Sequence, residues 1–455
     1  MIVVDRDSPR MREYEKFVKS RLAEHEKFKA ELREMRRLGF ETICVHGAFN
    51  RRAAYDAKSI IPSTALSSSS PFMHPLEAAA VLSYDVPGFV YTRISNPTNY
   101  FLELQMAMLE GYKLKEDTEA LFTSSGMSAI FMSVFPFIKS GDNIVSSNRV
   151  YGGTYMLFSE RLKQMGFETR WIERPWDLDE WKRRMDGRTR LLFVESPTNP
   201  ALFVADIKEL ADLAHSHEVP LIVDSTIATP VLMRPFEFGA DIVVHSVSKA
   251  LCGSGRIIGG CLVSRENIVT RSTEKGLKEN FADWVRKYPY RDFGPAFSPA
   301  NAERVIDEMK TLKMRMKKHS ENAMKVAKYL EAHPRISKVH YPGLESFEFH
   351  KTAKKYMKVV DEGTNAYSYL LSFEVKGSID DAEKVCENLR IGHLTTDLGK
   401  SSTIFIQPAT TTHLQLGQEA RGKAGITDGL IRYSAGLEDA DDLIADLERA
   451  LASIK

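Results

Sequence analysis

Short apolar runs rich in β-branched residues recur between residues 120 and 263, and no other feature of the chain constrains its fold as strongly. Segments of helical character, such as residues 154–165 and 206–217, lie between most of these runs. Strands that alternate with helices predict a mostly parallel sheet with helices on both faces. The expected strands are residues 120–123, 141–147, 166–172, 189–196, 219–226 and 240–249, and a further short apolar run follows at 261–263. The sequence therefore predicts an α/β fold.

Polar residues directly follow several of these expected strands, and ligands of parallel sheets bind at the carboxyl ends of the strands. A Ser-Ser-Gly turn at 124–126 opens an expected helix at Met127. Such a turn is either a phosphate site built from backbone N–H groups or only a helix cap. Asp224 closes an apolar run, where an ionised carboxylate requires a cation or hydrogen-bond donors. The other polar or aromatic residues in such positions are Tyr151, residues 195–199, Thr226, Ser246, Ser248 and Lys249.

Lys249 stands at the end of the apolar strand that contains Ile242–Val244, and glycines at 253, 255, 259 and 260 follow it. Lysine forms Schiff bases with carbonyl compounds when desolvation or a nearby cation lowers the pKa of its amine. A lysine at a strand end more often turns into solvent, so its interpretation depends on the other residues at the same edge.

Taken together, these residues match the requirements of pyridoxal phosphate. The cofactor needs a lysine amine, a carboxylate that keeps the pyridine nitrogen protonated, donors for the phosphate and an aromatic face over the ring. The lysine, the aspartate, the hydroxyls, the phosphate-binding turn and Tyr151 supply one of each. The sequence therefore predicts a pyridoxal-phosphate site at this edge of the sheet.

Length and charge exclude several other classes of protein. The chain has 455 residues, enough for two domains, and its net charge of +1 provides no field that would attract nucleic acid or an anionic membrane. No apolar run is long enough to span a bilayer, and the charged N-terminus lacks a signal-peptide core. The four cysteines are widely spaced, without histidines at metal-ligand spacing. We therefore expect a cytoplasmic protein without a metal.

The N-terminal segment differs from the rest of the chain. Residues 9–38 predict one amphipathic helix that begins at Pro9 and ends before Gly39. Such a helix packs on the body of the protein or on a neighbouring subunit, or it recruits another protein. Residues 40–90 contain several prolines and a run of serines, which predict an extended arm rather than a folded unit.

Nine strings in order resemble the Cys/Met-metabolism family of pyridoxal-phosphate enzymes. They are YTRISNPT (91–98), SSGMSA (124–129), YGGT (151–154), ESPTNP (195–200), VDSTIATP (223–230), GADIVVHSVSK (239–249), GPAFSP (294–299), ATTTHLQL (409–416) and LIRYSAGLED (430–439). The resemblance implies the aspartate-aminotransferase-like fold (fold type I), with a large domain built on a mostly parallel sheet and a smaller C-terminal α/β domain. The expected division is a helical extension (1–40), an arm (41–93), a cofactor domain (94–297) and a C-terminal domain (298–455). It also implies a homotetramer built from two tight dimers.

The resemblance also implies roles for individual residues. Lys249 would bond to the cofactor aldehyde and later move protons at the substrate, Asp224 would pair with the ring nitrogen, and Tyr151 would stack on the ring. The phosphate would be held by Ser125, Gly126, Met127, Ser246 and Ser248, with Tyr91 and Arg93 reaching the phosphate of the partner subunit. Asn199 would lie near the cofactor's phenolic oxygen and the substrate carboxylate, which Arg432 would clamp through two hydrogen bonds.

The sequence departs from the family pattern at a few positions. Ser248 stands where relatives usually have threonine, which keeps the hydroxyl. Residues 252–256 replace the Gly-Gly-His string that many members carry after the lysine. Asp397 stands where relatives usually have serine or asparagine, close to the expected site of the substrate carboxylate, and two carboxylates there would repel. Asp397 therefore either turns away or binds a cationic group of an unusual substrate.

Within the family, the strings at 294–299, 319–344 and 409–416 most resemble O-acetylhomoserine sulfhydrylases. The expected reaction is γ-substitution on O-acetyl-L-homoserine by sulfide or a small thiol. The alternatives are γ-elimination from methionine or an unusual γ-substituted amino acid, and cystathionine γ-synthesis. Methionine γ-lyases usually carry cysteine where Gly153 stands, and cystathionine-handling members often carry glutamate where Thr396 stands. A protein that binds the cofactor without catalysis and acts through its N-terminal helix is a further alternative.

Overall fold

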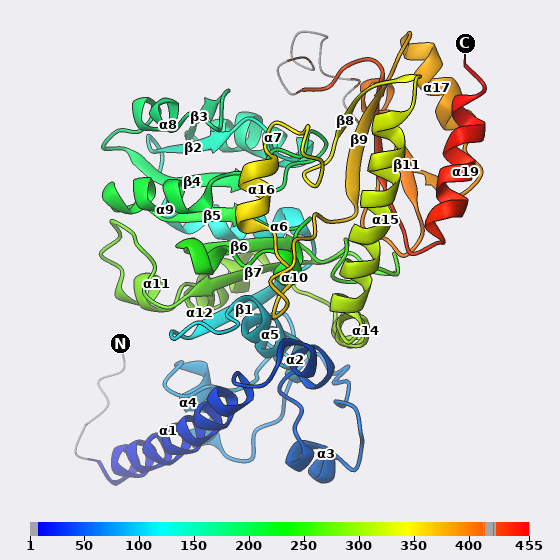
Figure 1. The fold of residues 1–455 in the computed structure, drawn as a ribbon. Coiled ribbons are helices and arrows are strands. Elements are labelled where there is room, and N and C mark those ends of the chain that lie inside the picture. Colours follow the sequence, from blue (N-terminus) through cyan, green and yellow to red (C-terminus); the bar gives the residue numbers. More distant parts are fainter. Residues whose placement is uncertain (1–7, 413, 415–421, 423–424, 455) are drawn as a thin grey trace.

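The larger of two sheets contains seven strands and lies at the centre of the computed structural model, which describes residues 8–412, 414, 422 and 425–454 (Figure 1). Its strands are β1 (Thr118–Thr123), β2 (Asn143–Ser147), β3 (Glu168–Ile172), β4 (Thr189–Glu195), β5 (Leu221–Asp224), β6 (Ile242–Ser246) and β7 (Gly260–Arg265). The spatial order is β1-β7-β6-β5-β4-β2-β3. Only β7 runs antiparallel to its neighbours, so the prediction of a mostly parallel sheet is confirmed.

Helices cover both faces of this sheet because alternate strand residues are apolar on both sides. Val194 and Val223 join one buried cluster with the helix α9 (Ile207–Ser216), while Phe193 and Ile222 join another with α6 (Gly126–Val134). Strands buried on both faces are typical of parallel sheets. The other helices around this sheet are α5 (Pro97–Glu110), η1 (Phe135–Phe137), α7 (Gly152–Met156), η2 (Leu157–Leu162), α8 (Leu178–Arg184), α10 (Thr229–Leu232), η3 (Pro235–Phe238), α11 (Lys275–Glu279), α12 (Phe281–Val285), η4 (Arg286–Tyr290) and α13 (Arg291–Phe293).

The C-terminal part of the chain forms the second, five-stranded sheet, whose order is β10-β11-β12-β9-β8. Its strands are β8 (Ile336–His340), β9 (Leu370–Val375), β10 (His393–Leu394), β11 (Ile404–Ile406) and β12 (Leu430–Ser434). The C-terminal part also contains the helices α14 (Pro299–Met309), α15 (Leu312–Ala332), α16 (His350–Tyr356), α17 (Ile379–Asn388), η5 (Pro408–Thr410) and α19 (Ala440–Leu451). Of these, α16 packs on the larger domain, where the Tyr356 ring contacts Phe238. Figure 1 shows the long helix α15 beside this smaller sheet, facing the larger one. The predicted α/β fold with a second, smaller sheet is therefore confirmed.

The N-terminal helix α1 (Pro9–Met35) begins after Ser8, whose side chain accepts a hydrogen bond from the backbone N–H of Met11. It ends three residues earlier than the predicted residue 38. Tyr14, Phe17 and Val18 pack against the buried residues Ala80, Val81 and Val86, so the helix docks on the arm of its own chain. The ion pair Arg21–Glu77 also joins α1 to α4, whereas Arg36, just after α1, pairs with Asp117 directly before β1.

The arm at residues 40–90 is more ordered than its composition predicts. It contains three short helices, α2 (Phe40–His46), α3 (Arg51–Ala57) and α4 (Pro75–Leu82). Asn50 caps α3 by accepting a hydrogen bond from the N–H of Ala53, and Pro75 occupies the first turn of α4, where its missing N–H costs nothing. Of the prolines and serines that predict irregular structure here, only Pro75 begins a helix; Pro62, Pro71, Pro87 and the serines at 67–70 lie outside the helices, as predicted.

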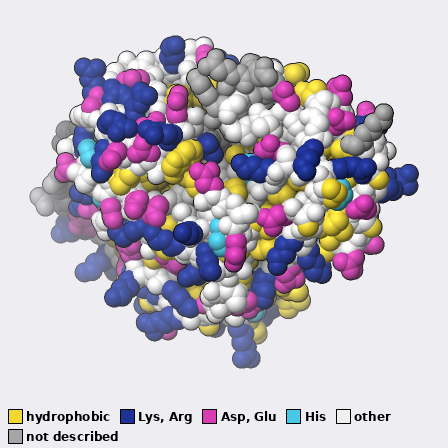
Figure 2. Space-filling view, turned by 45° about the horizontal axis from the view of Figure 1, so that its top comes forward, with side chains coloured by type: hydrophobic (Ala, Val, Ile, Leu, Met, Phe, Trp, Pro, Cys, Tyr) yellow, Lys and Arg dark blue, Asp and Glu magenta, His cyan; other side chains and the backbone are white. Residues whose placement is uncertain are grey.

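Basic and acidic side chains are interspersed on the face of the molecule shown in Figure 2, as the small net charge predicts. Within the described ranges, no helix is both long and apolar enough to cross a membrane. In the same part of the chain, no three His, Cys, Asp or Glu side chains lie close enough together to bind a metal ion. Part of the string at 409–416, namely residues 413, 415 and 416, lies outside the described residues.

Candidate active site

The carboxyl edge of the larger sheet collects most of the candidate residues. Asp224 is the last residue of β5, Ser246 is the last residue of β6, and Lys249 lies in the turn that follows. Ser125 follows β1 and is the N-cap of α6. These positions are brought together because β1, β5 and β6 all point the same way, so their ends share one edge of the sheet.

The N-terminus of α6 and the end of β6 form a close-fitting cradle. The Ser125 hydroxyl accepts a hydrogen bond of 3.1 Å from the N–H of Ser128. A Cβ added to Gly126 would lie 2.9 Å from the Cβ of Ser246, which shows how closely the two backbones approach. Ser248 accepts a 3.0 Å hydrogen bond from the N–H of Gly259. Free N–H groups at the helix N-terminus and these hydroxyls together suit a phosphate group.

Asp224 is a buried carboxylate that lacks a cationic partner. Its Oδ1 accepts hydrogen bonds from the backbone N–H and the hydroxyl of Thr226, at 3.1 and 2.6 Å. In the part of the chain that the structure describes, no lysine or arginine pairs with it, and burial raises its pKa while the bonds from Thr226 oppose that rise. A protonated ring nitrogen would supply the missing positive charge. The residue therefore fits the pyridinium of pyridoxal phosphate.

Glu195 lies beside Asp224 and holds two other candidate residues in place. The two carboxylates are paired in register at the ends of β4 and β5. The Glu195 side chain accepts hydrogen bonds from the backbone N–H groups of Tyr151, at 2.6 Å, and of Asn199, at 2.8 Å. Burial, followed by the negative charge of Asp224, raises the pKa of Glu195 well above its usual value. The sequence places Glu195 at a strand end but gives no sign that it joins these two loops.

Tyr151 precedes α7, and its side chain is half exposed at the mouth of the cradle. A Cβ added to Gly153 would lie 2.6 Å from Cε1 of Tyr151 and 3.1 Å from the sulfur of Met127. The phenol ring therefore lies against Gly153, next to a cradle residue. This is a suitable position for an aromatic ring that covers a cofactor.

Arg432 on β12 is directed toward the same place from the smaller sheet. Its Nη2 donates to the backbone oxygens of Thr396 and Asp397, at 3.1 and 2.7 Å, and its Nη1 donates to Oδ1 of Asn199 at 3.4 Å. Its buried Nε has no hydrogen-bond partner among the residues that the structure describes. Burial lowers the pKa of Arg432 to about 10, so the guanidinium remains charged at neutral pH. An amino-acid carboxylate would satisfy the orphaned Nε.

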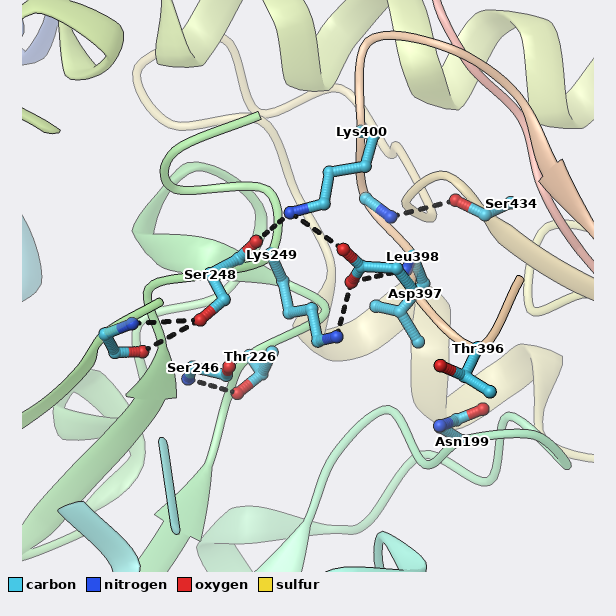
Figure 3. Close-up of polar contacts among 12 residues, drawn as sticks. Asn199, Thr226, Ser246, Ser248, Lys249, Thr396, Asp397, Leu398, Lys400 and Ser434 are labelled. Atoms are coloured by element: carbon cyan, nitrogen blue, oxygen red, sulfur yellow. Dashed lines mark hydrogen bonds and ion pairs between the residues drawn. The ribbon is translucent and has the colours of Figure 1, made fainter. Parts of the chain in front are cut away.

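Asp397 forms ion pairs with two lysines of its own chain. Figure 3 shows the amines of Lys249 and Lys400 directed at its two oxygens. The Lys249 Nζ–Oδ1 distance is 2.5 Å and the Lys400 Nζ–Oδ2 distance is 3.1 Å. The charge of Asp397 is thereby balanced within the chain, and Lys249 and Arg432 keep the carboxylate site positive. The sequence analysis did not single out Lys400, although it stands within the same Asp-Leu-Gly-Lys string.

Tyr91 and Arg93 lie together at the base of the arm. The Arg93 guanidinium stands 5.5 Å from the centre of the Tyr91 ring, and it also donates to the backbone oxygen of Arg291. Tyr91 is 44% exposed. The structure thus brings Lys249, Asp224, Tyr151, Asn199, Arg432, Asp397 and the cradle to one site, whereas Arg93 contacts Tyr91 and the backbone of Arg291.

The site combines a phosphate cradle, the lysine Lys249 and the buried carboxylate of Asp224, which a protonated pyridine ring would neutralise. These features define a pyridoxal-phosphate enzyme. The sequence model of the family described as "Cys/Met metabolism PLP-dependent enzyme" matches residues 41–452. This chain therefore belongs to that family, and the helix α1 precedes the matched region.

Named relatives show how the family's activities divide. An L-methionine gamma-lyase of Fusobacterium nucleatum subsp. polymorphum is 39% identical, over 81% of this chain and 87% of its own length. A homocysteine synthase of Schizosaccharomyces pombe is 36% identical, over 90% of this chain and 98% of its own. The crystal structure of an O-acetylhomoserine (thiol)-lyase from Campylobacter jejuni has a TM-score of 0.83 and 36% identity, and covers 91% of this chain and 100% of that chain. That crystal structure contains N'-pyridoxyl-lysine-5'-monophosphate, in agreement with the cofactor predicted here.

Proposed function

We propose that the protein replaces the acetoxy group of O-acetyl-L-homoserine with sulfide or a small thiol, which yields acetate and homocysteine or its thioether. The observation that carries the choice of reaction is Gly153. Methionine γ-lyases usually have cysteine at this position, and here a Cβ would lie 2.6 Å from the Tyr151 ring. A cysteine at this position would therefore require the half-exposed Tyr151 ring to move.

When bound, pyridoxal phosphate supplies an aldehyde that bonds to amines and a ring that accepts the electrons released at the substrate's Cα. The residues of the chain supply the rest. Arg432 and Asn199 bind and orient the substrate carboxylate, and Lys249 moves the proton at Cα. Tyr151 holds a proton near the oxygen that leaves Cγ, and Asp224 keeps its negative charge opposite the ring nitrogen.

Turnover of O-acetyl-L-homoserine and sulfide by the purified protein tests this proposal. We expect homocysteine from the wild type and none from the Lys249→Ala variant. Homocysteine formation no greater than that of Lys249→Ala would exclude the proposed activity.

The second candidate is γ-elimination from methionine, which the 39% identity to a methionine gamma-lyase favours. Release of 2-oxobutanoate from methionine without any added nucleophile would support it. Cystathionine γ-synthesis is the remaining alternative, and cysteine as the nucleophile in the same assay distinguishes it. A protein that binds the cofactor without catalysis would give no product with any of these substrates.

We also infer a homotetramer of two tight dimers, working in the cytoplasm. The exposed side of Tyr91 and the free state of all four cysteines support this assembly and location. An Arg93→Ala chain mixed and refolded with a Lys249→Ala chain tests whether Arg93 acts on the partner's cofactor. Half of the randomly formed dimers are then mixed, and each mixed dimer restores one of its two sites. We therefore expect about one quarter of the wild-type sites. No recovery in mixed dimers would contradict shared sites.

A further inference from the structure

Asp397 stands between two lysines of its own chain. Its Oδ1 lies 2.5 Å from Nζ of Lys249, and its Oδ2 lies 3.1 Å from Nζ of Lys400. Lys400 is almost fully buried, with its side chain 7% exposed, and its amine also donates to the backbone oxygen of Ser248. The three charges therefore form one connected cluster at the point where the cofactor aldehyde would meet Lys249.

The backbone around Asp397 keeps its carboxylate in this position. The N–H of Leu398 donates to Oδ1 at 2.9 Å, and the N–H of Gly399 donates to the hydroxyl of Ser434 at 2.9 Å. The backbone oxygen of Asp397 accepts from Arg432 at 2.7 Å. Gly399 has a φ of +69°, and a Cβ there would lie 2.9 Å from the backbone nitrogen of Ala250. These contacts fix the backbone of this loop beside the turn that carries Lys249.

We propose that Asp397 is a positioning residue that holds the Lys249 amine in an ion pair. The cofactor must displace this ion pair before it can bond to the amine. Lys400 sets the strength of the ion pair because it shares the carboxylate of Asp397. The inference rests on the proposed role of Lys249. It assigns a function to position 397, where relatives usually have serine or asparagine. Neither of those side chains carries the negative charge that an ion pair with Lys249 requires.

The charges around the lysine give the direction of the effect. Burial lowers the pKa of Lys249, Asp397 opposes this, and the cations Lys400 and Arg432 lower the pKa further. Burial raises the pKa of Asp397, but the two lysines outweigh this and hold it below its usual value. Among the described residues, the guanidinium of Arg432 and the buried phenol of Tyr369 also sense the charge of Asp397. Once the Asp397 carboxylate is removed, burial and the two cations all favour the neutral amine of Lys249. Removal of Lys400 instead favours the charged amine.

Cofactor loading measures this hold directly. The full-length protein is freed of cofactor, mixed with pyridoxal phosphate between pH 6 and 9, and followed by absorbance. Borohydride reduction and peptide mass spectrometry then locate the bound cofactor. Only the neutral amine bonds to an aldehyde, and one pKa unit changes its fraction about tenfold. We expect Asp397→Asn to load faster at neutral pH, with its profile displaced to lower pH.

Lys400→Met should displace the loading profile in the opposite direction, to higher pH. The matched control is Asp212→Asn, which removes a carboxylate that pairs with Lys208 on the exposed side of α9 and should load as the wild type does. Superimposable profiles for all variants, displacement of both variants in one direction, or failure of a folded Asp397→Asn protein to load would overturn the proposal. Attachment at a residue other than 249 in the wild type would instead refute the role of Lys249, so the two failures are distinguishable.

Discussion

Arg432→Lys is the substitution that most directly tests the proposed substrate site. The wild-type guanidinium is fixed by bonds to the backbone oxygens of Thr396 and Asp397, which leave Nε and Nη1 to face Asn199 and a substrate carboxylate. A lysine keeps the positive charge but presents a single ammonium group in place of the planar fork. The substitution therefore removes one hydrogen bond to a charged group without removing the charge.

The expected loss follows from the energy of that hydrogen bond. A hydrogen bond to a charged group contributes about 1.5–3 kcal/mol, which corresponds to roughly 10- to 150-fold in affinity. L-norleucine and n-pentylamine differ only in the carboxylate, and both change the absorbance of the bound cofactor. We expect Arg432→Lys to weaken norleucine binding by this factor and to change pentylamine binding by less than about twofold.

Arg170→Lys is the matched control, because Arg170 forms its ion pairs with Glu168 and Asp186 at the far edge of the larger sheet. Its affinity for both compounds should equal that of the wild type. Equal weakening of norleucine and pentylamine in Arg432→Lys would show that the substitution distorts the site as a whole. The assignment of Arg432 to the carboxylate would then be wrong.

Three further predictions concern stability and the N-terminal helix. Arg286→Met leaves the buried Glu103 without its 2.8 Å ion pair. The free energy of unfolding, measured in urea, should fall by about 3–5 kcal/mol, and a change below about 1 kcal/mol would contradict this prediction. Burial lowers the pKa of His319 to about 4, so the unfolded chain binds more protons between about pH 6.5 and 4. Stability should fall by up to about 3 kcal/mol as the pH drops through this range, and His319→Gln should remove that part of the pH dependence; an unaltered dependence would refute the assignment. Deletion of residues 1–38 exposes the apolar patch on α4, so protease cleavage within residues 60–91 should become faster. Turnover should persist, and loss of turnover would show that the helix supports the site itself.

Local pattern was sufficient for the larger sheet and for the residues at its edge. The run around Ile242–Val244 is apolar on both faces, so it had to be a buried strand, and Lys249 had to follow at its end. The same reasoning placed Asp224 at the end of β5. The resemblance in the nine strings then predicted the cofactor and the family, both of which the comparisons confirm.

The arm and the charge cluster could not be predicted in this way. The helices α2 and α4 are short, and their stability depends on contacts of α2 with the body of the protein and of α4 with α1 more than on their own sequence. Lys249 and Asp397 are 148 residues apart, and Lys400 reaches them only because the smaller sheet packs against the larger one. Hydrogen bonds and ion pairs depend on distances of a few ångströms between side chains.

Short-range periodicity therefore determined which segments of this chain form strands and helices, and the parallel order of those strands determined where a ligand would bind. Only the packing of the two sheets decided which charges meet there. The energy of a charge pair depends on its separation and on its burial, and neither quantity exists until distant segments have come together.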